Sequence, residues 1–264
     1  PRPVNCDTGS GSGLVNLRAR AIRVLSANWP APSQVRALTT LKTGGVSSGV
    51  FSTLNLAAHV GDEREAVTNN RAELKRALCL PAEPSWLSQV HGCGVVDVSA
   101  GSVGTVADAA YTTAPGSVVA VMTADCIPLF LSDTDGSFVA IVHVGWRGLC
   151  AGVIEALLGK LALPLGRILA WTGPGIGSDV YQVRADVREA LIDSFPGHES
   201  ALAATGNHWI ADLPTMVEQR LRHQGVIHIF HSGQCTYRQA DAYFSYRRDG
   251  QCGRMASLAW LESV

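Results

Sequence analysis

The chain has 264 residues, of which 47% are hydrophobic and 16% charged, and its formal net charge is −1. This composition allows one large domain with a sizeable core, and the lack of blocks of like charge argues against nucleic-acid and acidic-membrane partners. No apolar stretch is long enough to span a bilayer, so we expect no membrane association. Seven cysteines without a CxxC pair argue against a disulfide framework and favour a reducing, cytoplasmic location.

The first 21 residues differ in composition from the rest of the chain. They are rich in Gly, Ser and Pro and lack the sustained apolar run of a secretory signal. We therefore predict a flexible N-terminal tail over residues 1–21, in which Cys6 has no role. A single catalytic domain is expected to follow over residues 22–264.

Short apolar runs bounded by turn residues predict strands, and apolar residues at a spacing of three or four predict helices. Asp62 followed by Glu65 predicts a capping box at the start of the first helix. Strands and helices are mixed without a strict alternation, which indicates a mixed β-sheet core in an α/β or α+β fold. The expected strands are residues 35–41, 118–122, 127–131, 138–144, 167–171, 226–230, 242–246 and 255–261, and the expected helices are residues 62–79, 149–162, 185–194 and 213–223.

Four polar residues interrupt or follow the apolar strands of residues 118–150. They are Asp125, Cys126, His143 and Arg147. Burying such groups costs free energy unless each has a partner. We therefore expect the fold to be organised around what these side chains bind.

His91, Cys126 and His143 form a candidate metal site. Each is expected at a strand end or in a loop, and the two histidines have a glycine close by, although the three residues lie too far apart in sequence for a local zinc clip. Three His and Cys ligands with a fourth position left to water is the arrangement of a catalytic zinc site. The alternative is that each residue is merely structural, the cysteine as a small hydrophobic residue and the histidines as hydrogen-bonded groups.

Arg147 is a candidate anion ligand, because it lies on a glycine-flanked turn at the start of a helix. It could instead pair with Asp125, which itself could orient a ligand histidine, act as an acid or base, or close the turn. The KTGGVS turn offers Lys42 and Ser47 to an anion, although most Gly-Gly turns bind none. Arg247 lies in SYRRD, a pattern that is more often a solvated strand end than a site.

Long motifs from about residue 22 to the end resemble the bacterial YfiH/YlmD family. They read FSTLNLAAHVGD, WLSQVHG, VMTADCIPLFL, HVGWRGLCAGV and CTYR…YFSYRRDG…GRMASLAWL. This family has been labelled a laccase-like polyphenol oxidase. It is also described as a zinc-dependent purine nucleoside phosphorylase with adenosine deaminase and methylthioadenosine phosphorylase activities.

The resemblance implies an α/β sandwich with a mixed β-sheet. It also implies zinc bound by the His of QVHG, the Cys of ADC and the His of HVGWRG, which are His91, Cys126 and His143. One motif departs from the family pattern, because similar proteins usually read TTR where this chain reads TTLKTGG. Lys42 is therefore the candidate replacement for that arginine.

Three rival activities are open at this point. Copper is an alternative cofactor, since a blue-copper site also uses two His and one Cys, but a multicopper oxidase needs HxH pairs and this chain has none. A hydrolase could use Cys126 as nucleophile with His143 or His91 as base, or could split amides with zinc-bound water. A non-catalytic module would bind metal without turnover.

The hypothesis that joins these observations is a zinc-dependent purine nucleoside phosphorylase. It would convert adenosine, inosine or guanosine and phosphate to the base and ribose 1-phosphate, and would also act on methylthioadenosine and deaminate adenosine. The zinc deaminase pattern HxE…PCxxC is absent, so deamination would need another acid or base such as Asp125. We expect a monomer with small-molecule partners only. The expected catalytic residues are Cys126, Asp125 and Arg147, and the expected substrate-binding residues are Lys42, Ser47, Asn55, Gln89 and Arg247.

Overall fold

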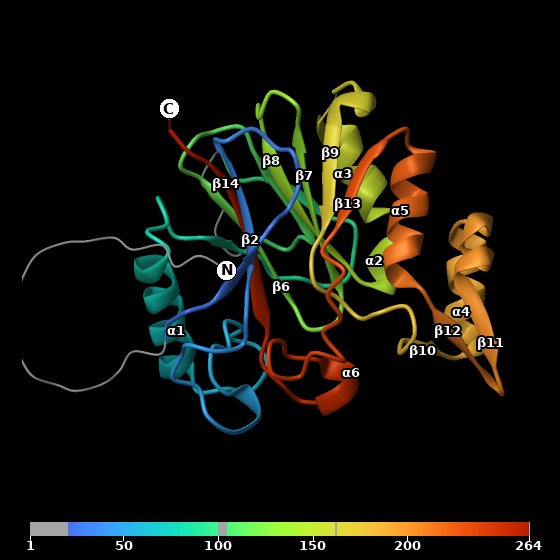
Figure 1. The fold of residues 1–264 in the computed structure, drawn as a ribbon, viewed down its shortest axis with the longest axis horizontal. Coiled ribbons are helices and arrows are strands. Elements are labelled where there is room, and N and C mark those ends of the chain that lie inside the picture. Colours follow the sequence, from blue (N-terminus) through green and yellow to red (C-terminus); the bar gives the residue numbers. More distant parts are fainter. Residues whose placement is uncertain (1–20, 100–104, 162, 264) are drawn as a thin grey trace, which may run out of the picture.

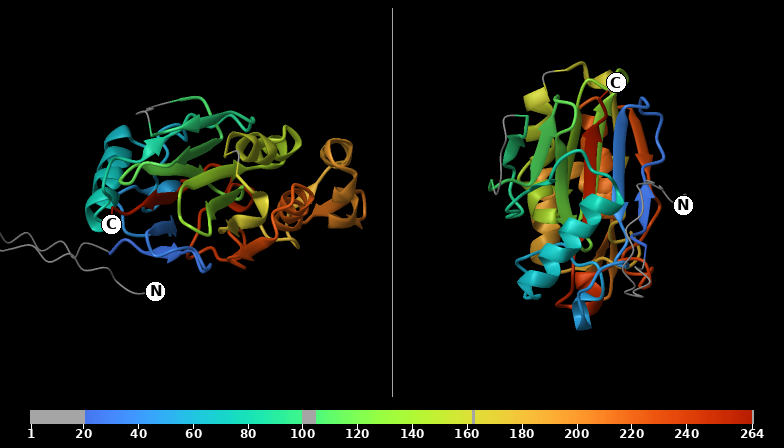
Figure 2. Two further views of the ribbon diagram at one scale, coloured as in Figure 1. Left: turned by 90° about the horizontal axis from the view of Figure 1, so that it is seen from above. Right: turned by 90° about the vertical axis from the view of Figure 1, so that its left-hand side faces the viewer.

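The computed structural model describes residues 21–99, 105–161 and 163–263, so nearly all of the predicted tail, including Cys6, lies outside the described residues. Two large β-sheets stack face to face, and helices cover both outer faces (Figures 1 and 2). This layered arrangement confirms the prediction of a mixed α/β sandwich. No helix within the described ranges is long and apolar enough to cross a membrane.

The first sheet has five strands, and its last strand in sequence lies at its centre. β14 runs antiparallel to both of its neighbours, β2 and β6, while β3 joins β6 in parallel. In order across the sheet, the strands are β1 (Val24–Ser26), β2 (Val35–Thr40), β14 (Met255–Leu261), β6 (Val118–Thr123) and β3 (Ser85–Trp86).

The second sheet has six strands, of which β13 and β9 are parallel and so are β4 and β5, while the other pairs are antiparallel. A small third sheet lies with α4 at one side of the molecule (Figure 1). The second sheet has the order β13 (His228–His231), β9 (Ile168–Thr172), β7 (Ile127–Asp133), β8 (Val139–Val144), β5 (Ala109–Thr112) and β4 (Val95–Asp97), and the third has the order β10 (Gln182–Val183), β12 (His208–Ala211) and β11 (Leu202–Thr205).

Helices cover the outer faces of the two large sheets. The helix α1 packs against the first sheet through Leu74, and α2, α3 and α5 cover the second sheet. The α-helices are α1 (Arg64–Ala77), α2 (Trp146–Cys150), α3 (Val153–Leu161), α4 (Ala185–Ser194), α5 (Leu213–His223) and α6 (Tyr246–Asp249), and the 3₁₀ turns are Gly49–Phe51, Leu165–Arg167 and Pro196–Ala201.

Side chains between the two large sheets form a dry core. Because successive side chains of a strand point to opposite faces, Phe130 and Ile141 point into this core while their neighbours Leu129 and Val142 face the helices. His143 has the parity of Ile141, so it continues the inner face at the end of β8. The chain crosses from one sheet to the other between β6 and β7, and Cys126 lies in that crossing.

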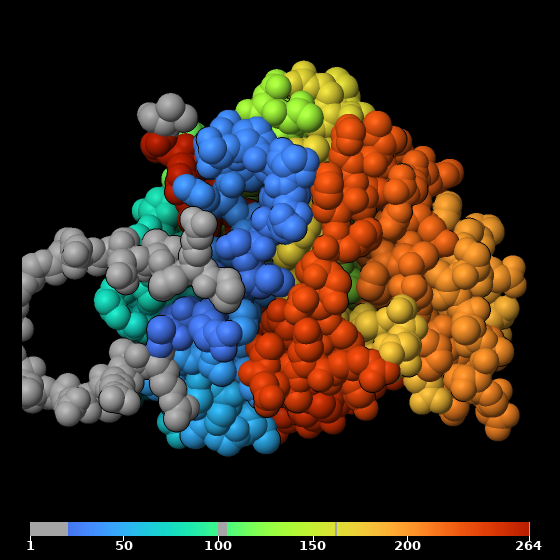
Figure 3. Space-filling view, viewed as in Figure 1, coloured from blue at the N-terminus to red at the C-terminus, as the bar shows by residue number. Residues whose placement is uncertain are grey.

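Segments that are distant in sequence meet on the surface as well as in the core. In Figure 3 the C-terminal third, coloured orange to red, lies directly against the blue N-terminal segment. Most predicted strands and helices are confirmed to within two residues at each end. Three predictions about local structure are wrong, and each has a physical cause.

Residues 242–246 were expected to form a strand, but they form an irregular segment that leads into α6. Tyr243 and Phe244 pack against Met255 in the core without pairing in a sheet, which is why an apolar run here does not form a strand. The Ser245 hydroxyl accepts a hydrogen bond from the Arg248 N–H and caps α6. The Arg248 guanidinium also donates to the Tyr243 carbonyl, which leaves that carbonyl bonded without a neighbouring strand.

The expected helix over residues 149–162 is divided into α2 and α3, because Gly152 adopts a left-handed conformation with φ of 79°. The expected capping box at Asp62 is also wrong. Glu63 is the N-cap of α1 and makes no side-chain capping bond. The Asp62 carboxylate instead accepts hydrogen bonds from the Ser47 hydroxyl and the Asn55 amide.

Gly152→Ala should destabilise the protein by about 1 kcal/mol, because an L-residue with a Cβ is strained in the left-handed region. Gly159→Ala is the matched control, since Gly159 lies in the exposed face of α3 with no atom near the added Cβ. That substitution should stabilise the protein by roughly 0.5–1 kcal/mol. Urea denaturation of both variants tests the pair, and equal shifts of the midpoint would contradict this account of the division between α2 and α3.

Candidate metal centre and its cavity

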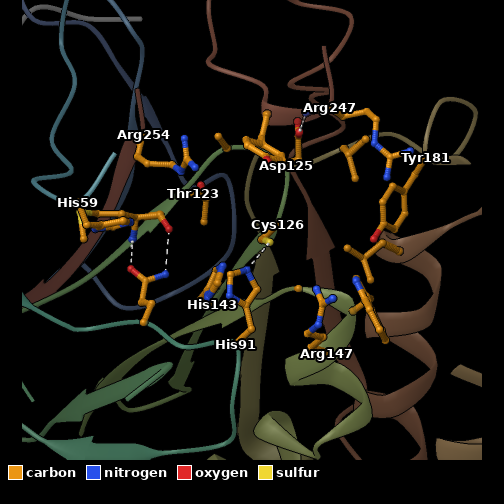
Figure 4. Close-up of a pocket in the computed structure, with 18 residues that line it drawn as sticks. His59, His91, Thr123, Asp125, Cys126, His143, Arg147, Tyr181, Arg247 and Arg254 are labelled. Carbon is orange, nitrogen blue, oxygen red and sulfur yellow. Dashed lines mark hydrogen bonds between the residues drawn. The ribbon is translucent and has the colours of Figure 1, made fainter. Parts of the chain in front are cut away.

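His91, Cys126 and His143 converge at the end of the core between the sheets. They come from the loop after β3, the crossing between β6 and β7, and the end of β8. Their ligand atoms all lie within 4.8 Å of one another, and in the described part of the chain they form the only such group of three or more His, Cys, Asp or Glu residues. The Cys126 Sγ lies 3.9 Å from the His91 Nε2, and the two imidazole rings meet edge to face (Figure 4).

The backbone around this group is shaped to bring the three side chains together. His91 and Asp125 both have left-handed backbone conformations, with φ of 59° and 95°. Gly145 passes so close that a Cβ added there would lie 2.9 Å from the Cys126 Sγ and 3.0 Å from the His91 Cδ2. The chain therefore needs glycine at this position to keep the thiol and the imidazole in place.

A buried carboxylate, Asp108, holds two of the three candidate ligands. It accepts hydrogen bonds from the backbone N–H groups of Val90, His91 and Gly92 at 2.7–3.1 Å. It also accepts from the His143 Nδ1 at 2.8 Å. This bond fixes the tautomer of His143, so that its Nε2 is the nitrogen left for a metal, as is usual for histidine ligands.

Charges in the group favour the metal-binding form of the cysteine. Burial by itself would raise the pKa of Cys126, but His143 and His91 lower it to about 6. Burial would lower the pKa of His143, but Cys126 and Asp108 raise it to about 9. Burial would likewise raise the pKa of Asp108, and the hydrogen bonds from His143 and Gly92 hold it below its usual value. One thiolate and two imidazoles, of which the His143 ring is oriented by Asp108, fit a metal ion such as zinc or copper.

The group opens into a cavity of about 520 Å³. Arg147, Arg247 and Tyr181 line one side of this cavity, and His59 and Arg254 line the other (Figure 4). Arg147 lies over the ring of Trp146 and Arg247 lies over the ring of Tyr181, at 4.3 Å and 5.0 Å from the ring centroids. Neither arginine forms an ion pair with any residue that the structure describes, so the cavity presents positive charge to a ligand.

Asp125 lines the cavity but already has donors on both carboxylate oxygens. The Thr236 hydroxyl donates to its Oδ1 at 2.7 Å, and the Arg247 N–H donates to its Oδ2 at 2.6 Å. It therefore ties Thr236 and the first turn of α6 to the crossing that carries Cys126. Arg147 is not paired with it, which removes one of the alternatives open from the sequence.

The residues predicted to bind substrate divide into two groups. Gln89 and Arg247 line the cavity, and Gln89 also binds the backbone of Met122 through both ends of its amide. Lys42, Ser47 and Asn55 do not line it. Ser47 and Asn55 are buried and both donate to the partly buried Asp62, in a network that holds the Gly-rich turn.

Four residues of the site were missed in the sequence, namely Asp108, His59, Arg254 and Tyr181. Asp108 directly precedes β5, and a carboxylate beside a buried strand was the available signal. His59 and Arg254 lie inside the long motifs already quoted. Partial burial lowers the pKa of His59, and the nearby Arg254 lowers it further, which favours the neutral form of this imidazole.

Comparisons with known proteins agree with this fold. A family model described as "Multi-copper polyphenol oxidoreductase laccase" matches residues 36–262. The protein named purine nucleoside phosphorylase YfiH from Shigella flexneri is 43% identical over 90% of this chain and 99% of its own length. A crystal structure of a Neisseria meningitidis protein has a TM-score of 0.87 at 38% identity, and covers 91% of this chain and 99% of its own.

The crystal structure of YlmD from Geobacillus stearothermophilus is also similar, with a TM-score of 0.82 at 28% identity over 88% of this chain and 93% of its own. The chain therefore belongs to the laccase-like family that the matching model describes, and its resemblance to YfiH and YlmD proteins is confirmed.

Asp108→Asn should weaken metal binding by roughly 10- to 100-fold, because the amide cannot accept all the hydrogen bonds that orient His91 and His143. Competition with a chromophoric chelator measures this affinity. Asp133→Asn is the matched control: Asp133 is also buried and accepts from Ser137, but it lies at the opposite end of β7 from Cys126. Equal metal affinity in the two variants would show that Asp108 does not orient the ligands.

Proposed function

We propose that this protein is a purine nucleoside phosphorylase that holds a zinc ion between His91, Cys126 and His143. One observation carries the proposal: the candidate metal group and two arginines without carboxylate partners, Arg147 and Arg247, line the same cavity. Phosphorolysis of a nucleoside needs an anion site beside the ribose and a means to stabilise the departing base. The names of the similar proteins support this choice of reaction.

Zinc suits the donor set, because two imidazoles and a thiolate leave one position of a tetrahedral site open. When bound, it would supply a Lewis acid or an activated water at the centre of the cavity. The contribution of the chain is orientation. Asp108 holds His143 and the His91 backbone, and Gly145 leaves the space in which the three ligands meet.

The arginines would hold the second substrate. A guanidinium grips phosphate through two parallel N–H donors, and Arg147 and Arg247 lie on one side of the metal group. A phosphate oxygen bonds to C1′ of the ribose while the C1′–N bond breaks and its electron pair leaves with the purine. His59 lies on the opposite wall of the cavity and would hydrogen-bond that purine.

The proposal includes methylthioadenosine as a nucleoside substrate and the deamination of adenosine by water. A cavity of about 520 Å³ has room for a nucleoside and an anion. Deamination needs an acid or base beside the purine, and the bonded oxygens of Asp125 make His59 the better candidate.

A Cys–His hydrolase is the second candidate, because His143 lowers the pKa of Cys126 as a catalytic cysteine requires. A cysteine bound to zinc cannot also act as a nucleophile. Metal analysis of the purified protein therefore discriminates the two, and stoichiometric zinc that is required for turnover excludes the cysteine hydrolase.

Zinc-loaded protein should show negligible oxidation of phenols, although the matching family is described as a multicopper laccase. A multicopper enzyme needs several metal sites, and within the described ranges only one His/Cys group can hold a metal. Oxygen consumption with a phenolic substrate measures this activity. Robust oxidation with one metal ion per chain would contradict the expectation.

Arg147→Ala should raise the KM for phosphate roughly 10- to 100-fold, because a hydrogen bond to a charged group contributes about 1.5–3 kcal/mol. Zinc content should remain unchanged in this variant. Cys126→Ala should lose both zinc and turnover. The assay follows adenine and ribose 1-phosphate formed from adenosine and inorganic phosphate.

Arg36→Ala is the matched control for this experiment. Arg36 is paired with Glu262 in the first sheet and does not line the cavity, so its loss should leave the KM for phosphate unchanged. If turnover does not depend on phosphate and Arg147→Ala behaves like the wild type, the phosphorylase proposal is wrong and the protein is a hydrolase.

A further inference from the structure

A second cavity, of about 380 Å³, lies at the carboxyl ends of the parallel strands β9 and β13. It shares no lining residue with the metal cavity. Ligands of α/β proteins are often found where parallel strands end, because side chains and loops project there without a continuing ladder. Residues from the N-terminal half of α5 close one side of this cavity.

Three side chains in its lining form a continuous hydrogen-bonded series. Thr172 is the last residue of β9 and His231 is the last residue of β13, and the two are direct neighbours across the parallel ladder. The Thr172 Oγ1 lies 2.8 Å from the His231 Nδ1. The His231 Nε2 lies 2.8 Å from a carboxylate oxygen of Glu218 on α5.

The chemistry of the three groups sets the direction of these bonds. A carboxylate only accepts hydrogen bonds, so the Nε2 of His231 carries a hydrogen and donates to Glu218. In the neutral ring the Nδ1 then has a free lone pair, and it accepts the hydrogen of the Thr172 hydroxyl. A hydroxyl that donates to a histidine held by a carboxylate is the arrangement that activates a nucleophile.

Glu218 is held in its ionised form by the groups around it. Burial would raise its pKa, but hydrogen bonds from Arg222 and His231 lower it below its ordinary value. Gly233 also lines this cavity, and its backbone N–H donates to no acceptor among the described residues. A carbonyl oxygen that gains negative charge needs such a donor.

We propose that Thr172, His231 and Glu218 form a second, metal-independent site that transfers the acyl group of small uncharged esters to water. Two carboxylates in the lining, Glu218 and Asp212, disfavour anionic substrates. Thr172 is the nucleophile, His231 is the general base, and Glu218 is a positioning residue. This proposal does not depend on the reaction at the metal centre.

The reaction proceeds in two balanced steps. The Thr172 oxygen bonds to the ester carbonyl carbon, and its proton passes to the His231 Nδ1 and from there to the alkoxy oxygen of the ester, which leaves as the alcohol with the electron pair of the broken C–O bond. Water then attacks the acyl carbon and gives a proton to His231, and the threonine oxygen leaves and is reprotonated. The products are a carboxylic acid and an alcohol, and no external oxidant or reductant is needed.

The test uses p-nitrophenyl acetate with the full-length protein, as purified and after treatment with a chelator. Hydrolysis above the buffer rate is expected in both preparations. Thr172→Val and His231→Gln should each lower the rate by about 100-fold or more, as general-base catalysis predicts. Thr172→Ser keeps a hydroxyl nucleophile and should retain turnover. Glu218→Gln should lower kcat with little change in KM.

His228→Gln is the matched control, since His228 lies on the same strand but does not line the cavity, and its rate should equal that of the wild type. Mass mapping of acid-quenched protein should find one acetyl group on Thr172, which tests the proposal even if the valine variant does not fold. Acetyl groups on cysteines alone, or equal rates in Thr172→Val, His231→Gln and wild type, would overturn it.

Discussion

The hydrogen bonds accepted by Asp108 are the interaction on which the metal centre depends. One fully buried carboxylate receives three backbone N–H groups of the loop that carries His91 and the Nδ1 of His143. Without those donors the buried charge would be costly, and without the charge the loop and the strand end would have no common anchor. Two of the three candidate ligands are thus placed by one group that would not touch the metal.

The stacking of the two sheets places the third ligand and the cavity. The crossing between β6 and β7 has to leave one sheet and enter the other within a few residues, and Cys126 lies in it. The same crossing carries Asp125, which accepts hydrogen bonds from the Thr236 hydroxyl and from the Arg247 N–H in the first turn of α6. The Cys126 thiol and the backbone of Arg247 are therefore positioned by a single turn between the two sheets.

The sequence was informative where a property is local and less so where it depends on neighbours in space. Apolar runs predicted most strands, because strands that are buried on both faces consist largely of apolar residues. His91, Cys126 and His143 were recognisable as soft ligands at strand ends or in loops. Ser47 and Asn55 were predicted to bind substrate, but both side chains donate hydrogen bonds to Asp62 within the protein. Asp108 receives its four hydrogen-bond donors only when the chain folds, and no residue spacing in the sequence predicts this arrangement.

The central position of β14 has a consequence for the order of folding. This strand comes last in the described chain, yet it lies between β2 and β6 and supplies the only ladder that joins them. During synthesis, β2 and β6 emerge first and have unpaired edges until residues 255–261 leave the ribosome. Contacts of such large sequence separation form slowly and leave apolar edges open in the meantime. The first sheet, and the gap in which the cavity forms, can therefore close only after translation has passed β14.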